Sequence, residues 1–168
     1  MSKFLELCRA YTHARHIFKD YEAVCKELAA ELWYNLAAYY EIPIDRIDYR
    51  QLNEYGAFER ADSLEAWRMV MLDDASFEFG IGITLYEVPE EFPYAHHTIV
   101  LPFLVSVDNE EKGHFTFGNE NKKFEVTKGV STTFRPLLDY VFIALKKEYE
   151  EGLTNMKVQN TVRTIGFK

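Results

Sequence analysis

The sequence predicts a single α+β domain over residues 1–168, with a long N-terminal helix or helix pair, a four- to five-stranded antiparallel meander and a C-terminal helix packed on one sheet face. Three observations predict this class. The first 42 residues contain neither glycine nor proline and repeat apolar residues at helical spacing. Residues 67–127 alternate apolar and polar side chains, as strands do. Residues 133–152 return to helical spacing, and no linker divides the chain.

The N-terminal helical segment, residues 1–42, has an apolar stripe that repeats nearly every 3.5 residues. An unbroken helix here would be roughly 57 Å long, more than a domain of this size needs to cover its own sheet. We expect one part to pack on that sheet and the overhang to support a homo-oligomer. One helix, or two with a break near residues 19–23, would fit the pattern. The stripe consists of Phe4, Leu7, Tyr11, Ala14, Phe18, Tyr21, Cys25, Leu28, Leu32 and Tyr39.

Residues 44–66 mix charged and apolar groups and predict a short helix and turns, so we expect the sheet to begin near Trp67. Pro102 lacks a backbone donor, which predicts that its strand lies at an edge or contains a bulge. Gly80 and Gly82 indicate that another element, such as the long helix, approaches the sheet closely. Four or five strands are expected, at residues 68–72, 77–86, 98–107, 113–117 and 124–126.

The last helix, about residues 134–151, can be capped by a hydroxyl from residues 131–133 and is ended by Gly152. The tail, residues 155–168, alternates weakly and carries bases without acids, which fits either a final edge strand or a basic arm. No stretch approaches the length of a membrane span, and Cys8 and Cys25 lie too far apart on one helix to form a disulfide. We therefore expect a soluble cytoplasmic protein with reduced thiols.

The formal net charge is −8 and is concentrated in the middle of the chain. Residues 67–112 contain nine acids against the two bases Arg68 and Lys112. This excess repels nucleic-acid phosphates, so it disfavours direct nucleic-acid binding and favours a partner with a basic surface.

Two sets of polar residues suggest chemistry. His96-His97-Thr98 and His114-Phe115-Thr116 are similar to the paired motif of two-histidine phosphoesterases, a resemblance that implies proton transfer by the histidines. A hairpin that turns near residues 109–113 would, however, place His114 opposite about Asp108 and roughly 33 Å from His96. Asp108 with Glu120-Asn121-Lys122 resembles the acidic metal-binding signature of restriction-type nucleases, although here these residues fall in a turn.

The sequence favours a protein-binding module over an enzyme, and we identify no catalytic residue, metal ligand or cofactor motif. The expected function is that of an inhibitor, an immunity-type protein or a chaperone-like accessory protein, acting through acidic loops at the sheet ends. A phosphoesterase or metal-dependent hydrolase using His96, His97 and His114 is the alternative. The expected partner-binding residues are Asp73, Asp74, Glu87, Glu90, Glu91, Phe92 and Tyr94.

Overall fold

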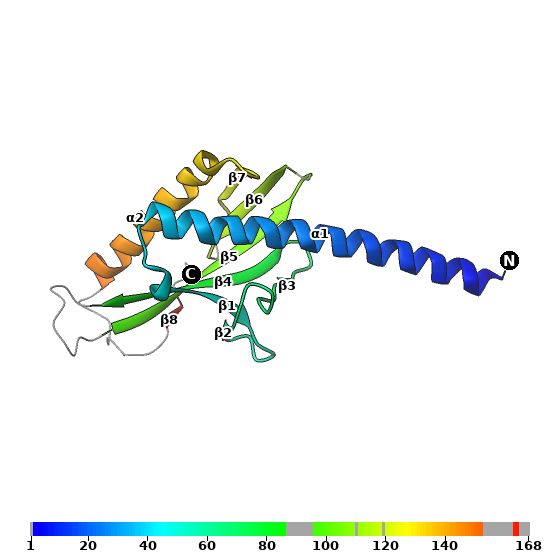
Figure 1. Cartoon of the computed structure of the whole chain (residues 1–168), viewed down its shortest axis with the longest axis horizontal. Coiled ribbons are helices and arrows are strands. Elements are labelled where there is room, and N and C mark those ends of the chain that lie inside the picture. Colours follow the sequence, from blue (N-terminus) through cyan, green and yellow to red (C-terminus); the bar gives the residue numbers. More distant parts are fainter. Residues whose placement is uncertain (1, 87–95, 110, 119, 153–162, 165–168) are drawn as a thin grey trace.

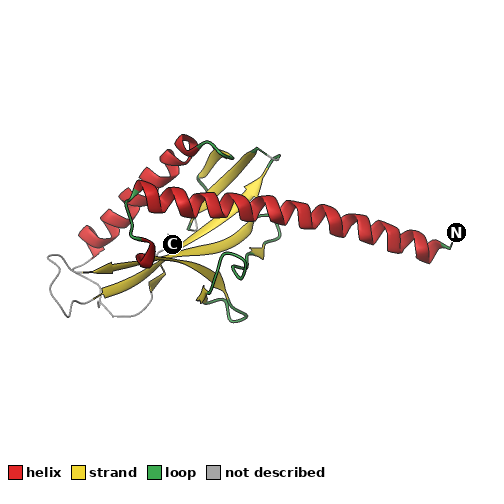
Figure 2. Cartoon of the chain, in the orientation of Figure 1, coloured by secondary structure: helices red, strands yellow, loops and turns green. Residues whose placement is uncertain are grey.

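A computed structural model arranges the chain in two layers, a mainly antiparallel sheet and two helices on one of its faces (Figure 1). The structure describes residues 2–86, 96–109, 111–118, 120–152 and 163–164. The predicted α+β class, with a long N-terminal helix and a C-terminal helix, is confirmed. Figure 2 shows the strands gathered beneath both helices.

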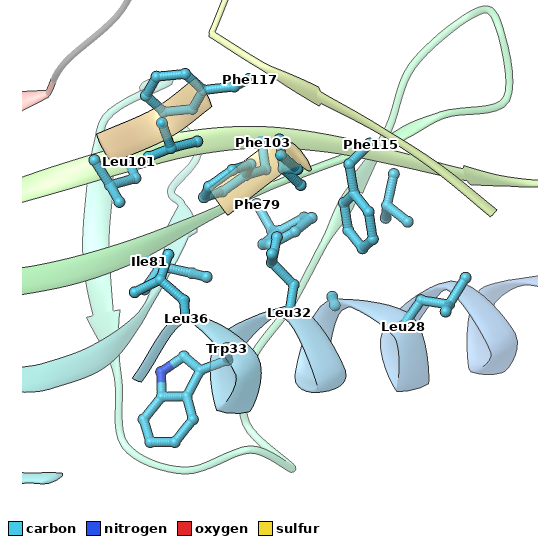
Figure 3. Close-up of a cluster of buried hydrophobic side chains, with 14 of the residues drawn as sticks. Leu28, Leu32, Trp33, Leu36, Phe79, Ile81, Leu101, Phe103, Phe115 and Phe117 are labelled. Atoms are coloured by element: carbon cyan, nitrogen blue, oxygen red, sulfur yellow. The ribbon is translucent and has the colours of Figure 1, made fainter. Parts of the chain in front are cut away.

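The N-terminal segment forms one continuous helix, α1 (Lys3–Tyr39), with no break near residues 19–23. It begins at the N-cap Ser2, whose hydroxyl accepts a hydrogen bond from the Leu5 amide at 3.1 Å. From Cys25 onward, one side of α1 is buried against the sheet (Figure 3). Burial raises the pKa of the Cys25 thiol to about 11, so this thiol stays protonated.

The main path of the sheet runs β2-β1-β4-β5-β6-β7, with β3 also paired to β4 and β8 paired to β5. All described pairs are antiparallel except the parallel β5–β8 pair, so residues 163–164 of the tail add a short strand. The strands are β1 (Ile47–Leu52), β2 (Phe58–Ala61), β3 (Val70–Met71), β4 (Phe77–Tyr86), β5 (His96–Val107), β6 (Lys112–Phe117), β7 (Lys123–Thr127) and β8 (Arg163–Thr164).

The short helix expected within residues 44–66 is replaced by the β1–β2 hairpin, which follows a single 3₁₀ turn, η1 (Ile44–Arg46). The strand count is therefore larger than predicted. The expected turn before Trp67 is present, and the Ser63 hydroxyl accepts a hydrogen bond from the Ala66 amide. The apolar–polar alternation of β1 is not visible in the sequence, because the polar residue Gln51 occupies a buried position. Its side-chain oxygen accepts a hydrogen bond from the Arg68 amide at 2.8 Å. The Asn53 carboxamide closes the hairpin by accepting from the amides of Tyr55 and Ala57.

Pro102 lies in the central strand β5 and pairs in regular register with Gly80, so the expected edge or bulge is absent there. The Pro102 carbonyl accepts from the Gly118 amide. Because the nitrogen and carbonyl of one strand residue face the same side, the missing donor of Pro102 also faces the β6 side. The β5–β6 register ends at Phe103 and Phe117, so the missing donor lies just past the end of the paired ladder.

The C-terminal helix α2 (Arg135–Gly152) follows a 3₁₀ turn, η2 (Ser131–Phe134), and packs on the same face as α1. The Thr133 hydroxyl accepts from the Thr127 amide at 2.9 Å, which ties this turn to the end of β7. Aromatic contacts then join helix and sheet, between Phe115 and Phe134 and between Phe124 and Tyr140. The inner face of the sheet and both helices thus share one core.

The close approach between α1 and the sheet occurs at Gly113 of β6. The expectation that the long helix approaches the sheet at Gly80 and Gly82 is wrong. A Cβ added at Gly113 would overlap the Leu28 side chain and lie 3.1 Å from the Ser106 carbonyl oxygen. At Gly80 the close neighbours are Phe58 and Val100, and at Gly82 they are the side chains of Asp48 and Arg50. These two glycines accommodate neighbouring strands on the outer face.

Replacement of Gly113 by alanine tests the contact between α1 and the sheet. We expect Gly113→Ala to lower the free energy of unfolding by about 1–3 kcal/mol in urea denaturation, because the methyl group overpacks a buried site. In a Leu28→Ala background the same change should cost less, since the shortened side chain leaves room. Equal costs in both backgrounds would show that the Leu28 contact is not responsible.

Glu78 of β4 provides a pH-dependent test of the outer face. Burial raises the pKa of this carboxyl, so its ionised form destabilises the fold. We expect Glu78→Gln to raise the free energy of unfolding at pH 7. The gain should shrink as the pH falls through the raised pKa, because the native carboxyl then becomes neutral as well. Glu54→Gln, at an exposed loop position, should show no such gain at either pH.

Candidate functional site

The first part of α1 extends past the end of the sheet (Figure 1). We call residues 3–19 the projecting helix; every side chain in it is exposed except Cys8 and Phe18, which are intermediate. Contact with the sheet begins at its end, where the rings of Phe18 and Phe77 lie 6.3 Å apart and the Tyr21 hydroxyl donates to the Ala75 carbonyl at 2.6 Å.

The apolar side of the projecting helix continues the side of α1 that packs on the sheet. Phe4, Tyr11, Phe18, Cys25 and Leu32 follow at intervals of seven, so they share one side of the helix. Cys25 and Leu32 are fully buried, whereas Phe4 is 75% exposed and Tyr11 66% exposed. The apolar stripe therefore packs on the sheet in the C-terminal half of α1. In the N-terminal half, around Phe4 and Tyr11, none of the described residues covers it.

The projecting helix is basic, whereas the rest of the chain is acidic. Four bases, Lys3, Arg9, Arg15 and Lys19, stand against the single acid Glu6, which gives the projecting helix a formal charge of +3. Since the whole chain carries −8, the remainder carries −11. The structure thus separates the two signs of charge along its length.

Two of the expected partner-binding residues, Asp73 and Asp74, lie in the turn between β3 and β4. The Tyr21–Ala75 hydrogen bond places this turn beside the root of the projecting helix. The hydroxyl and amide of Ser76 donate to the Asp74 carboxylate at 2.5 and 3.0 Å, and these bonds lower the pKa of Asp74. The Asp74 carboxylate is therefore an anion, and its hydrogen bonds from Ser76 also stabilise the β3–β4 turn. The Asp73 side chain is exposed.

The β5–β6 turn brings further acidic residues to the same end of the sheet. Phe77 at the start of β4 pairs with Val105 near the end of β5, and Val107 then pairs with Gly113 of β6. Asp108 and Glu111 thus lie at the sheet end from which α1 projects. The expected residues Glu87, Glu90, Glu91, Phe92 and Tyr94 lie outside the described residues; the strands that flank them meet at the Tyr86–His96 pair, at the opposite end of the β4–β5 hairpin.

The histidines of the alternative hydrolase function are not brought together. His97 pairs with Leu85, whereas His114 pairs with Ser106, nine residues further along β5 and therefore roughly 30 Å away. Glu120 follows the far end of β6, so the strand also separates it from Asp108. Neither the two-histidine arrangement nor the nuclease-like arrangement forms a site.

His114 instead contacts Asp108, the residue that the sequence analysis placed opposite it, and also Glu125, which the sequence analysis did not assign to it. Its Nε2 lies 2.6 Å from Oδ2 of Asp108, and it pairs across the β6–β7 ladder with Glu125. The ligand atoms of these three residues all lie within 4.8 Å of one another. The alternation of β6 and β7 was the available signal, because Phe115 and Phe124 face the core and so place His114 and Glu125 on the outer face.

An apolar groove of about 860 Å³ lies at the other end of α1, between the helices and the far ends of β4 and β5. Burial raises the pKa of Tyr40 in its wall, and the Tyr40 hydroxyl donates to the Leu138 carbonyl. The groove is mainly apolar, but its lining also carries two polar pairs, Tyr39 with Asp139 at 2.5 Å and Lys146 with Glu150 at 3.7 Å. Its lining consists of Tyr39, Tyr40, Ile42, Ile83, Leu85, Ile99, Asp139, Phe142, Leu145, Lys146, Tyr149 and Glu150.

Within the part of the chain that the structure describes, no helix has the length and apolar character needed to cross a membrane. Comparison of the chain with protein-family models, with curated proteins and with solved structures finds no match.

Proposed function

We propose that this chain is a protein-binding module whose partner is a second copy of itself, docked through the projecting helix. The observation that carries the proposal is the exposed apolar stripe of residues 3–19, which continues the buried stripe of α1. Leu7 on this stripe is 68% exposed, between the still more exposed Phe4 and the similarly exposed Tyr11. Burial of such side chains against a partner releases roughly 1.5–3 kcal/mol for each one fully covered.

A helical segment of this kind is marginal without packing. An isolated helix of about 12–15 residues is barely stable in water, and helices in proteins gain most of their stability from an apolar face that is covered. Residues 3–19 have a good N-cap in Ser2 and a covered continuation from Cys25 onward, which support the helix from both ends. A partner on the exposed stripe would supply the missing packing along its length.

Charge favours a second copy as that partner. The acidic middle of the chain predicts a partner with a basic surface, and the projecting helix of this chain has such a surface. The acidic residues Asp73, Asp74, Asp108 and Glu111 lie in turns at the root of the same helix. An antiparallel pair of projecting helices would therefore bring the basic N-terminal end of each copy to the acidic turns of the other.

The spacing of the stripe is compatible with a two-fold axis at Tyr11. Phe4 and Phe18 lie seven residues on either side, so each would face the other residue of the second copy. Leu7 and Ala14 lie four and three residues to either side of Tyr11. In the antiparallel pair, the large Leu7 side chain of one copy therefore lies near the small Ala14 side chain of the other. The overlap between Phe4 and Phe18 is about 21 Å, which indicates a small interface and a dimer that dissociates readily.

The proposal predicts that substitutions on the stripe dissociate the dimer. We expect the wild-type chain to be dimeric by sedimentation equilibrium at about 100 µM and to dissociate as salt is raised, because screening weakens the charge attraction. Phe4→Glu combined with Tyr11→Glu should weaken the dimer at least tenfold, since it places carboxylates in an apolar contact. Leu5→Glu combined with Thr12→Glu is the matched control: it adds the same charge one residue further along, about 100° around the helix from Phe4 and Tyr11, and should leave the dimer intact.

A charge exchange tests the antiparallel arrangement separately. Asp73→Lys should weaken association, and adding Lys3→Glu should restore it, because the second change re-creates an opposite-charge pair between copies. A monomeric wild-type chain would reject self-association, and equal losses in the stripe and control variants would reject the stripe as the contact. Additive losses from Asp73→Lys and Lys3→Glu would reject the antiparallel arrangement.

A further inference from the structure

We infer that Asp108, His114 and Glu125 form a binding site for a divalent transition-metal ion of the zinc class on the outer face of the sheet. The three residues come from three consecutive parts of the chain: Asp108 directly follows β5, His114 lies in the middle of β6, and Glu125 lies in the middle of β7. They offer one imidazole nitrogen and two carboxylates, a donor set that zinc and its neighbours accept.

The distances are close to those that a metal requires. Ligands bound at about 2.0–2.2 Å from a tetrahedral ion lie roughly 3.4 Å from one another. The ligand atoms here already lie within 4.8 Å of one another, and the Nε2–Oδ2 pair of His114 and Asp108 is closer than the ion would allow, at 2.6 Å. Because Asp108 and Glu125 are exposed, their carboxylates can shift by the ångström or so that coordination requires.

The backbone that carries the site is held in place independently of any ion. His114 lies between Gly113, against which Leu28 of α1 packs, and Phe115, which is fully buried. The β6–β7 register sets His114 opposite Glu125, so their Cβ atoms lie about 4.5–5.5 Å apart. The Asn109 side chain accepts from the amides of Glu111 and Lys112, which fixes the turn that follows Asp108. Little backbone ordering is thus required on binding.

The chemistry of the donors selects the class of ion. Imidazole nitrogen disfavours Mg²⁺ and Ca²⁺, which prefer all-oxygen sites, and suits Zn²⁺, Co²⁺ and Ni²⁺. Three protein ligands leave at least one position of a four-coordinate ion for water or another ligand. The proposed site therefore keeps an open coordination position. The bound ion would also cross-link β5, β6 and β7.

The Glu125 carboxylate already attracts one cation, the Lys112 ammonium, which lies 3.6 Å from Oε1 of Glu125. A metal ion at the site must compete with this ammonium for the Glu125 carboxylate. Removal of the Lys112 charge should therefore tighten metal binding, which a simple surface ion pair between His114 and Asp108 would not predict.

Calorimetric titration of the untagged, full-length chain with zinc chloride tests the site. We expect one zinc ion per chain, with affinity reduced at least tenfold by His114→Ala and by Glu125→Gln. Lys112→Met, which retains the apolar stem of the side chain, should increase the affinity. Zinc should raise the midpoint of thermal unfolding of the wild-type chain but not of His114→Ala, whose metal-free midpoint should match that of the wild type.

Other histidines provide the controls. His13 and His16 lie three residues apart on the projecting helix and are a conceivable adventitious pair, whereas His96 and His97 point to opposite faces of β5 and could each hold zinc only singly. His16→Ala and His96→Ala should leave the zinc affinity unchanged. Absence of binding at about 1 mM zinc, or a loss that follows His16 or His96 in place of His114, would overturn the inference. The Phe4→Glu/Tyr11→Glu variant should bind zinc normally, which separates this site from the proposed dimer contact.

Discussion

The packing of α1 on the inner face of the sheet determines the position of everything else in this structure. Leu28, Leu32 and Leu36 lie on that face together with Phe79, Phe103 and Phe115 (Figure 3). Trp33 extends the contact sideways: its ring stacks on Tyr49 at 4.9 Å, and its nitrogen donates to the Asp48 carbonyl. Since a helix is a stiff rod, fixing residues 25–36 also fixes the direction in which residues 3–19 leave the sheet.

The same packing gives the two faces of the sheet different kinds of side chain. Alternation along β6 turns Phe115 toward α1 and His114 away from it. The core therefore uses one set of positions, and the polar residues of the outer face are free to form a cluster such as Asp108, His114 and Glu125. A shift of the strand by one residue would exchange the two sets, so the buried aromatic residues also fix the position of the imidazole.

Much of this fold could be predicted from sequence because local patterns were strong. The absence of glycine and proline from residues 1–42 and the alternation of residues 77–86 correspond to α1 and β4. The β1–β2 hairpin could not be recognised, because Gln51 is a polar residue whose burial depends on a hydrogen bond to a distant amide. Glu125 was missed as a neighbour of His114 for a similar reason: the two meet only through the β6–β7 register, which single-residue patterns do not specify.

Charge separation along the long axis also bears on how large an assembly can become. The basic helix and the acidic turns of one chain meet at the root of that helix, so a second chain that docks antiparallel uses both surfaces of both molecules. Such a contact closes on itself and leaves nothing for a third chain. If the basic segment and the acidic turns lay at opposite ends of the molecule, the same attraction would join chains head to tail without limit. In the proposed dimer, the short distance between them would therefore favour a closed pair over a filament.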